Sequence, residues 1–192
     1  MKKLNGNLYK QGESVNNYSD SSYDVLEPGA YICEVVEVKD HPDQEFLEVI
    51  YDICEGTHKW YFQKLNDKFG FWGGTFRAYY TDKAKDVFFA RFCKHINASN
   101  KGLEFNPFAD GKNADEHSIE GRHFGIVLHK EIYTKADGSI GSRVTSDIKG
   151  VVTVEAAKDG KFNKKLLEDV DRTESNNGFK PVREEVEGIL FQ

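Results

Sequence analysis

The sequence predicts a mainly β protein with one helix, in which five strands form a Greek-key barrel and the helix lies between strands three and four. Three observations lead to this class. Five short runs are rich in β-branched and aromatic residues and are bounded by turn signals. One stretch has apolar residues spaced by three and four, as a half-buried helix requires. The length of 192 residues suits one such domain.

Two other classes fit less well. A doubly wound α/β fold needs more helices than this chain offers. A β-sandwich needs about seven strands and would leave the long helix unexplained.

The first two strands are expected at residues 30–39 and 45–54, joined by a turn at 41–44. The first strand follows the turn signal Pro28-Gly29. It carries apolar side chains on both faces, which is typical of a strand in a sheet that curls into a barrel. The second strand alternates more regularly, with one apolar face formed by Leu47, Val49, Tyr51 and Ile53.

The third strand is expected at residues 58–65, after a hairpin turn at 55–57. Residues 67–74 contain three glycines, so we expect a loop there. A helix should begin at Thr81 or Asp82, either of which can cap it, and run to about residue 99. Its buried stripe would consist of Ala84, Phe88, Phe89, Phe92, Cys93 and Ile96.

The last two strands are expected at residues 121–134 and 143–155, with a turn at 135–142 that contains Asp137-Gly138. Between the helix and the fourth strand, residues 103–120 are polar and acidic and predict an excursion over the surface. The order strand, strand, strand, helix, strand, strand is that of the OB-fold.

The domain should therefore cover residues 24–160. Residues 1–23 are rich in Asn, Ser, Asp and Gly and predict a flexible N-terminal arm. Residues 161–192 predict a charged C-terminal tail that begins with a short, charged, partly helical segment.

Several function classes lack support in the sequence. No run approaches the roughly 18 apolar residues of a membrane-spanning helix, and the N-terminus lacks the apolar segment of a secretion signal. Three isolated cysteines indicate free thiols in a reducing compartment, so we expect a cytoplasmic location in a host cell. No metal-ligand pair, phosphate loop, dinucleotide motif or nucleophile elbow is present, so we expect neither a cofactor nor enzymatic activity.

The charge is unevenly distributed. The chain carries a net −6, but residues 57–101 hold nine Lys or Arg against three Asp, a net +6, whereas residues 1–56 hold four against twelve, a net −8. Nine aromatic residues fall within residues 60–80, inside the basic segment. Aromatics interleaved with cations are explained either by a packed core strand or by a platform on which unpaired bases stack. Because the local field decides where a polyanion binds, the second explanation stays open.

Three segments together resemble a known group of proteins: PGAYICEVVEVKD with LEVIYDI, the aromatic basic stretch, and GRHFGIVLHKEIYTKADGSIGSRVTSDIKGVVTVEA. This pattern of strands and turns, over about residues 25 to 160, is similar to phage and mobile-element proteins of Gram-positive hosts that are encoded beside replication and recombination genes. The resemblance implies an OB-fold protein of the single-stranded-DNA-binding type. It carries no agreed set of binding residues.

In an OB-fold barrel, ligand crosses strands two and three and is held by the loops between strands one and two and between strands four and five. Cations there would contact phosphates and aromatic rings would stack on bases; the alternative for each residue is a solvated rim or a packed core. The expected nucleic-acid-binding residues are Lys39, Trp60, Phe62, Lys64, Trp72, Arg77, Lys130, Tyr133, Lys135 and Arg143.

The function expected from these observations is sequence-independent, non-catalytic binding of single-stranded DNA in phage replication or recombination. A first alternative is a protein-interaction or inhibitor module that acts on a host or phage enzyme, with its acidic surfaces mimicking DNA. A second is a metal-dependent nuclease, which the absence of a nuclease motif disfavours.

The C-terminal residues 183–192 are acidic and then apolar. They loosely resemble the tails with which bacterial single-strand-binding proteins recruit replication and recombination enzymes, which would then be partners. The alternative is that Leu190-Phe191-Gln192 is what a picornaviral 3C protease leaves after cleavage. A homo-oligomer is also compatible with the sequence.

Overall fold

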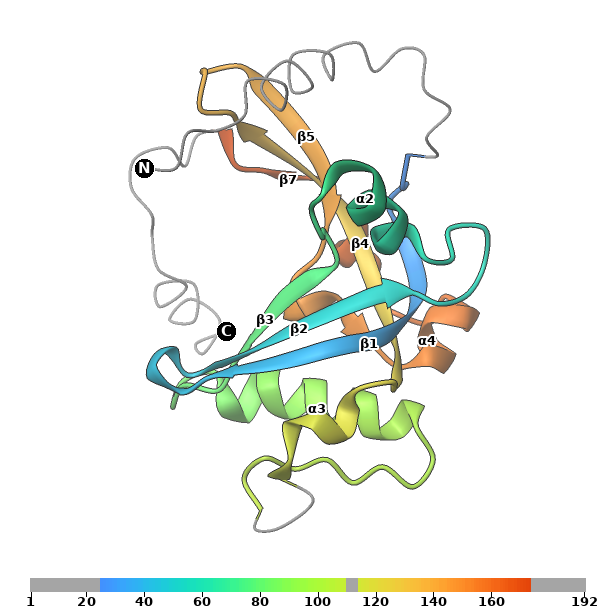
Figure 1. Cartoon of the computed structure of the whole chain (residues 1–192), viewed down its shortest axis with the longest axis vertical. Coiled ribbons are helices and arrows are strands. Elements are labelled where there is room, and N and C mark those ends of the chain that lie inside the picture. Colours follow the sequence, from blue (N-terminus) through green and yellow to red (C-terminus); the bar gives the residue numbers. More distant parts are fainter. Residues whose placement is uncertain (1–24, 110–113, 174–192) are drawn as a thin grey trace.

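The computed structural model describes residues 25–109 and 114–173. Within these residues seven strands form one sheet. Five of them follow the order β3-β2-β1-β4-β5, and the other two, the short strands β6 and β7, pair with β4 (Figure 1). All pairs are antiparallel except β4 with β7. The expected N-terminal arm and the last nineteen residues of the expected tail lie outside the described residues. The strands are β1 (Gly29–His41), β2 (Phe46–Ile53), β3 (Thr75–Tyr79), β4 (His123–Thr134), β5 (Ile140–Thr145), β6 (Val151–Val152) and β7 (Val170–Asp171).

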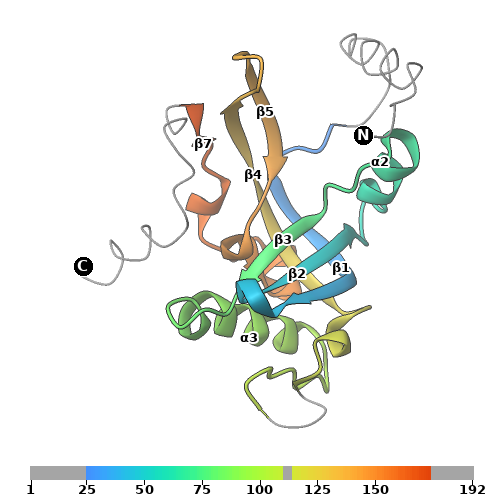
Figure 2. The same cartoon turned by 60° about the vertical axis from the view of Figure 1, so that its left-hand side comes forward.

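Three α-helices accompany the sheet within the described residues: α2 (Tyr61–Phe69), α3 (Ala90–Ser99) and α4 (Val154–Asp159). The helix α3 lies across one end of the sheet, and the β4–β5 hairpin projects from the other end, in both views (Figures 1 and 2). None of the helices in the described part is long and apolar enough to cross a membrane.

The predicted strands 30–39 and 45–54 are confirmed as β1 and β2. A bulge between Val35 and Glu37 explains why β1 is apolar on both faces. Before the bulge the core side chains are Cys33 and Val35, and after it the core side chain is Val38, because one extra residue reverses the alternation. The extra residue, Val36, is 44% exposed.

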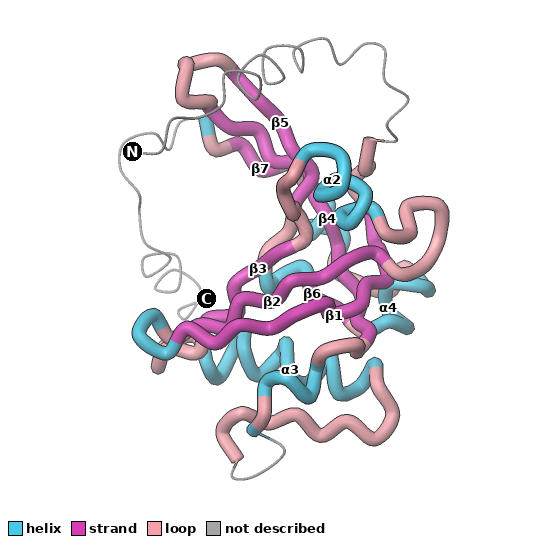
Figure 3. Tube along the Cα trace, in the orientation of Figure 1, coloured by secondary structure: helices cyan, strands magenta, loops and turns pink. Residues whose placement is uncertain are grey.

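The prediction of a third strand at 58–65 is wrong. That segment enters α2, and β3 begins directly after the expected glycine-rich loop (Figure 3). The buried carboxylate of Asp52 accepts hydrogen bonds from the backbone N–H groups of Phe62 (2.9 Å) and Gln63 (3.0 Å), which satisfies donors that a helix start leaves unpaired. After the helix, Gly74 passes so close to the backbone oxygen of Tyr51 and the ring of Phe62 that no side chain fits there. The chain then pairs with β2.

The predicted helix after Thr81 is confirmed, although its first turn differs. Residues Lys85–Phe89 form a π-helical turn that leads into α3. Phe89, Phe92 and Ile96 are each at most 1% exposed, as the spacing of three and four predicts. The predicted surface excursion at residues 103–120 is only partly at the surface, because Phe105 and Ile119 are buried in the core.

The fourth strand is confirmed as β4, and the fifth is confirmed only in part. The predicted strand 143–155 divides into the end of β5, a 3-10 turn at Ile148–Gly150, β6 and the start of α4. The hydroxyl of Thr153 accepts a hydrogen bond from the Ala156 N–H (3.1 Å) and so caps α4. Because Gly125 has no side chain, α4 packs directly on β4: an added Cβ would lie 2.7 Å from that of Ala157.

The mainly β class is therefore confirmed, whereas a closed barrel with one helix is not. In the described part of the chain, the path through the sheet ends at β3 on one side and at β5 on the other, and these two strands do not pair. The core lies between the β1–β2–β3–β4 face and α3 and is rich in aromatic contacts, such as that between Phe76 and Phe92 with ring centroids 5.7 Å apart.

Candidate nucleic-acid interface

Seven of the ten candidate residues fall on three surfaces, and Phe62, Trp72 and Lys130 lie elsewhere. The two loops expected to hold one ligand lie at different ends of the sheet: the β1–β2 turn near α3, and the β4–β5 turn at the far end of the projecting hairpin (Figures 1 and 2). Lys39 and Arg77 belong to the first of these regions, Tyr133, Lys135 and Arg143 to the second. The remaining surface surrounds α2.

The first surface, here called the three-strand face, is the side of β1, β2 and β3 that faces away from α3. The strand register arranges it in three rows of three residues, one from each strand. The rows are His41–Phe46–Tyr79, Lys39–Glu48–Arg77 and Glu37–Ile50–Thr75.

The aromatic row of the three-strand face is already stacked internally. The rings of His41 and Phe46 are stacked with centroids 4.5 Å apart, and the ring of Tyr79 lies 5.2 Å from that of Phe46. The guanidinium of Arg77 covers Phe46 at 4.9 Å. Phe46 is therefore only 2% exposed, and a base could stack on it only if Arg77 moved.

The charged row adds little attraction for a polyanion. Glu48 stands between Lys39 and Arg77, and the ammonium of Lys39 lies 3.2 Å from the carboxylate of Glu37. Two cations face two carboxylates, so the three-strand face is close to neutral when His41 is neutral. Exposed ion pairs of this kind are weak and are screened by salt.

The second surface is one face of the β4–β5 hairpin, here called the hairpin face. The pairs Glu131–Arg143 and Tyr133–Gly141 stand directly opposite each other on it. The guanidinium of Arg143 lies 5.4 Å from the centre of the Tyr133 ring. Gly141 leaves room that the Tyr133 ring and the Lys135 side chain occupy. The hairpin thus brings together three of the ten candidates, whereas alternation along β4 turns Lys130 to the opposite face.

A buried carboxylate organises the hairpin face. The side chain of Glu131 is 5% exposed. One of its oxygens accepts hydrogen bonds from Nε (2.9 Å) and Nη2 (2.6 Å) of Arg143, and the other accepts one from Nε of Arg172 (2.7 Å). Arg172 was not among the predicted residues. It directly follows β7, and no local pattern could have placed it beside Glu131, 41 positions earlier in the chain.

The third surface, here called the α2 surface, consists of Lys59, Trp60, Lys64 and Phe71. Trp60 is 41% and Phe71 is 54% exposed. The ammonium of Lys59 lies 5.1 Å from the centre of the Trp60 ring, and that of Lys64 donates to the Lys59 carbonyl (2.9 Å). Phe71 was missed because the glycine-rich loop gave no indication of which ring would point outward.

Two other aromatic candidates serve the fold. Phe62 is 5% exposed and packs edge-on against Tyr51, with centroids 5.5 Å apart. The indole N–H of Trp72 is shared between the carbonyl oxygens of Tyr51 (3.2 Å) and Gly74 (3.1 Å), so this half-buried ring ties the loop to β2.

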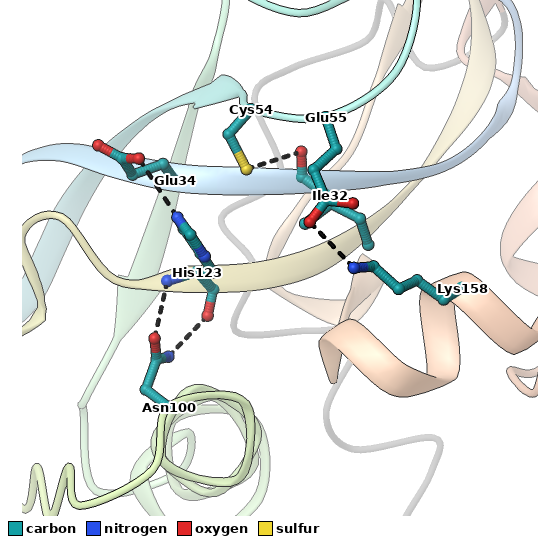
Figure 4. A network of polar contacts seen from close by, with 7 residues as sticks. All are labelled: Ile32, Glu34, Cys54, Glu55, Asn100, His123 and Lys158. Atoms are coloured by element: carbon teal, nitrogen blue, oxygen red, sulfur yellow. Dashed lines mark hydrogen bonds and ion pairs between the residues drawn. The ribbon is translucent and has the colours of Figure 1, made fainter.

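The histidines and cysteines form no site of their own among the described residues, where no group of three His, Cys, Asp or Glu side chains could hold a metal ion. His123 instead belongs to a structural network (Figure 4): its Nε2 lies 3.3 Å from Glu34, and the Asn100 side chain bonds both its backbone N–H and its carbonyl. All three cysteines are free and buried. Burial raises the pKa of Cys54 to about 11 and that of Cys93 to about 12, so neither is a reactive thiolate at neutral pH.

Comparison of the chain with protein-family models and with curated proteins finds no match.

Proposed function

We propose that this protein binds single-stranded DNA without catalysis and without strong sequence preference, chiefly through the hairpin face. The observation that carries the proposal is the convergence of Tyr133, Lys135 and Arg143 on one exposed hairpin. A ring for stacking and cations for phosphates are the two components of sequence-independent single-strand binding.

The topology supports the same proposal. The path β3-β2-β1-β4-β5, with α3 between β3 and β4, has the strand neighbours of an OB-fold in which β3 and β5 have not closed the barrel. We regard the sheet as such an open variant. In OB-folds the loop between the last two strands is a ligand-binding loop, and here that loop joins β4 and β5. The role in phage replication or recombination belongs to this proposal and follows from the sequence resemblance.

A second candidate function is a protein-interaction module, and the α2 surface favours it. Two large aromatic side chains are exposed at the two ends of α2: Trp60, with the Lys59 ammonium over its ring, before the helix, and Phe71 after it. Aromatic residues at the centre of a patch are typical anchors of protein interfaces. Under this alternative, substitutions on the α2 surface would abolish partner binding and leave DNA affinity unchanged.

The test is an equilibrium titration of the full chain against a fluorescent oligo-dT and against a duplex of equal length, by anisotropy. We expect tighter binding to the single strand and no cleavage in Mg²⁺ or Mn²⁺. The variant Lys135→Gln should weaken binding about threefold and lower the slope of log K against log salt by roughly 0.7.

The matched control is Lys158→Gln, which removes the same charge from α4, where Lys158 pairs with Glu55 at 3.0 Å. Its affinity should equal that of the unmodified protein. Absence of oligo-dT binding at low salt would reject the proposed function, and cleavage of the oligonucleotide would favour a nuclease instead.

A further inference from the structure

The two guanidinium groups that share Glu131 form an arrangement that the fold alone does not require. One arginine is enough to neutralise one buried carboxylate, yet both Arg143 and Arg172 bond to it. The three groups together keep one positive charge. Arginine–glutamate–arginine clusters contribute little net stability compared with apolar packing, so stability does not account for the second arginine.

Both guanidinium groups are open to solvent. The side chain of Arg143 is 61% exposed and that of Arg172 is 55% exposed, although the carboxylate between them is almost fully buried. Glu131 contacts Nε and Nη2 of Arg143, so Nη1 is not used by this carboxylate. Guanidinium groups whose orientation is fixed bind phosphate oxygens through paired hydrogen bonds.

An aromatic ring stands beside this charge. The Arg143 guanidinium lies over the Tyr133 ring, 5.4 Å from its centre, and the end of the ring packs above Gly141 on the neighbouring strand. A base on the ring and a phosphate on the arginines would be the two parts of one nucleotide. A single strand can offer both at once, whereas the bases of a duplex are stacked on one another and cannot reach the ring.

We propose that Arg143 and Arg172, oriented by Glu131, bind one backbone phosphate of a single DNA strand while Tyr133 stacks on an adjoining base. Glu131 is a positioning residue, and Arg172 is an additional binding residue. The proposal rests on the proposed function and specifies where on the hairpin face one nucleotide binds.

The experiment measures oligo-dT affinity of the full chain over a series of salt concentrations for two variants that separate charge from stacking. Arg172→Gln removes one positive charge, so we expect affinity to fall about fivefold and the salt slope to fall by roughly 0.7. Tyr133→Leu removes the ring and keeps the charge, so affinity should fall about tenfold with the slope unchanged. The control Lys161→Gln removes an equal charge after α4, where Lys161 pairs with Asp159, and should change neither quantity.

Two further measurements test whether each variant folds and whether the site binds a nucleotide or any phosphate ion. Thermal unfolding of each variant checks that the fold is kept, and Arg172→Lys, which keeps the charge, should restore the slope. Inorganic phosphate, added at constant ionic strength, should compete with oligo-dT only at far higher concentration than unlabelled oligo-dT. Equal competition would mean a simple anion site and would overturn the nucleotide assignment.

The outcomes separate this inference from the proposed function. If oligo-dT binds but Arg172→Gln leaves both affinity and slope unchanged, the phosphate site is wrong and the proposed function stands. If oligo-dT does not bind to the unmodified protein, both are wrong.

Discussion

Two described residues hold the backbone in the left-handed region although neither is glycine: Glu45 at φ 53° and Trp60 at φ 61°. This conformation costs roughly 1–2 kcal/mol for a residue with a side chain. Glu45 lies between the 3-10 turn Pro42–Gln44 and β2, and Trp60 lies just before α2. The Trp60 side chain is exposed at the start of α2. The first turn of this helix is fixed by hydrogen bonds from its backbone N–H groups to Asp52.

Glycine at position 45 should stabilise the protein. Glu45 is exposed, so Glu45→Gly removes the strain without loss of packing, and we expect the free energy of unfolding to rise by about 0.5–1 kcal/mol after the greater freedom of glycine in the unfolded chain is allowed for. Urea denaturation of both proteins measures this difference in the free energy of unfolding.

The control is Asp43→Gly in the same turn, which removes the same charge from a residue whose φ is not positive. It should lower the free energy of unfolding or leave it unchanged. Equal gains in both variants would show that charge, and not backbone strain, is responsible.

At the scale of elements, Asn100 joins the end of α3 to the start of β4. Its amide nitrogen donates to the carbonyls of Ile96 and His123 (2.7 Å each), and its amide oxygen accepts from the His123 N–H (3.0 Å). Asn100→Leu should lower the free energy of unfolding by about 2 kcal/mol, because three hydrogen bonds are lost at about 1 kcal/mol or less each. Asn106→Leu, which loses one 3.2 Å contact to Phe108, is the control and should have a much smaller effect in the same urea titration.

A titrating pair fixes the turn before β4 to β1. One oxygen of Glu120 accepts from the Val38 N–H (3.0 Å) and lies 2.9 Å from Nδ1 of His117. The hydrogen bond raises the pKa of His117 above its ordinary 6.5 and lowers that of Glu120 below its ordinary 4.5. The His117 contribution to stability is lost as pH rises through its raised pKa, and the Glu120 contribution is lost as pH falls through its lowered pKa.

The pair therefore stabilises the fold most between pH 4.5 and 6.5. Glu120→Gln should return the pKa of His117 toward 6.5, as followed by NMR titration of the imidazole. It should also flatten the dependence of the melting temperature on pH above 6.5 and below 4.5, where the contribution of the pair is otherwise lost. A His117 pKa that does not change would contradict this account.

Sequence reasoning located the elements whose signals are local. The strands β1, β2 and β4 and the helix α3 follow from alternation, from spacing of three and four, and from turn residues that stand beside them. The helix α2 was missed because its start depends on Asp52, ten positions before Phe62, and because the aromatic residues around it also suit a strand. The strand β3 was missed because Gly73 and Gly74 suggested only a loop.

In the candidate site, the residues that flank one turn were predictable from the sequence, and the contacts between distant segments were not. Tyr133, Lys135 and Arg143 flank one turn, so a hairpin necessarily brings them together. The roles of Glu131 and Arg172 depend on the parallel pairing of β7 with β4, which nothing in the short segment around Val170 indicates. Which rings are exposed around α2 depends likewise on contacts between distant elements.

The net charge of the whole chain and the charge of the hairpin face have opposite signs. The chain carries −6, and the three-strand face is nearly neutral. On the hairpin face, the positive charges of Lys135, Arg143 and Arg172 outnumber the negative charge of Glu131, and the Arg143 guanidinium lies 5.4 Å from the centre of the Tyr133 ring. DNA binding should therefore centre on this hairpin and be weakened by salt, because its cations neutralise backbone phosphates and thereby release counterions from the strand.

Backbone amide NMR would locate the DNA-binding surface directly. We would titrate the ¹⁵N-labelled full chain with oligo-dT and follow the amide shifts. We expect the largest changes on residues 129–145 and 170–173 and little change on the three-strand face. Changes confined to the α2 surface, or no changes at low salt, would contradict it.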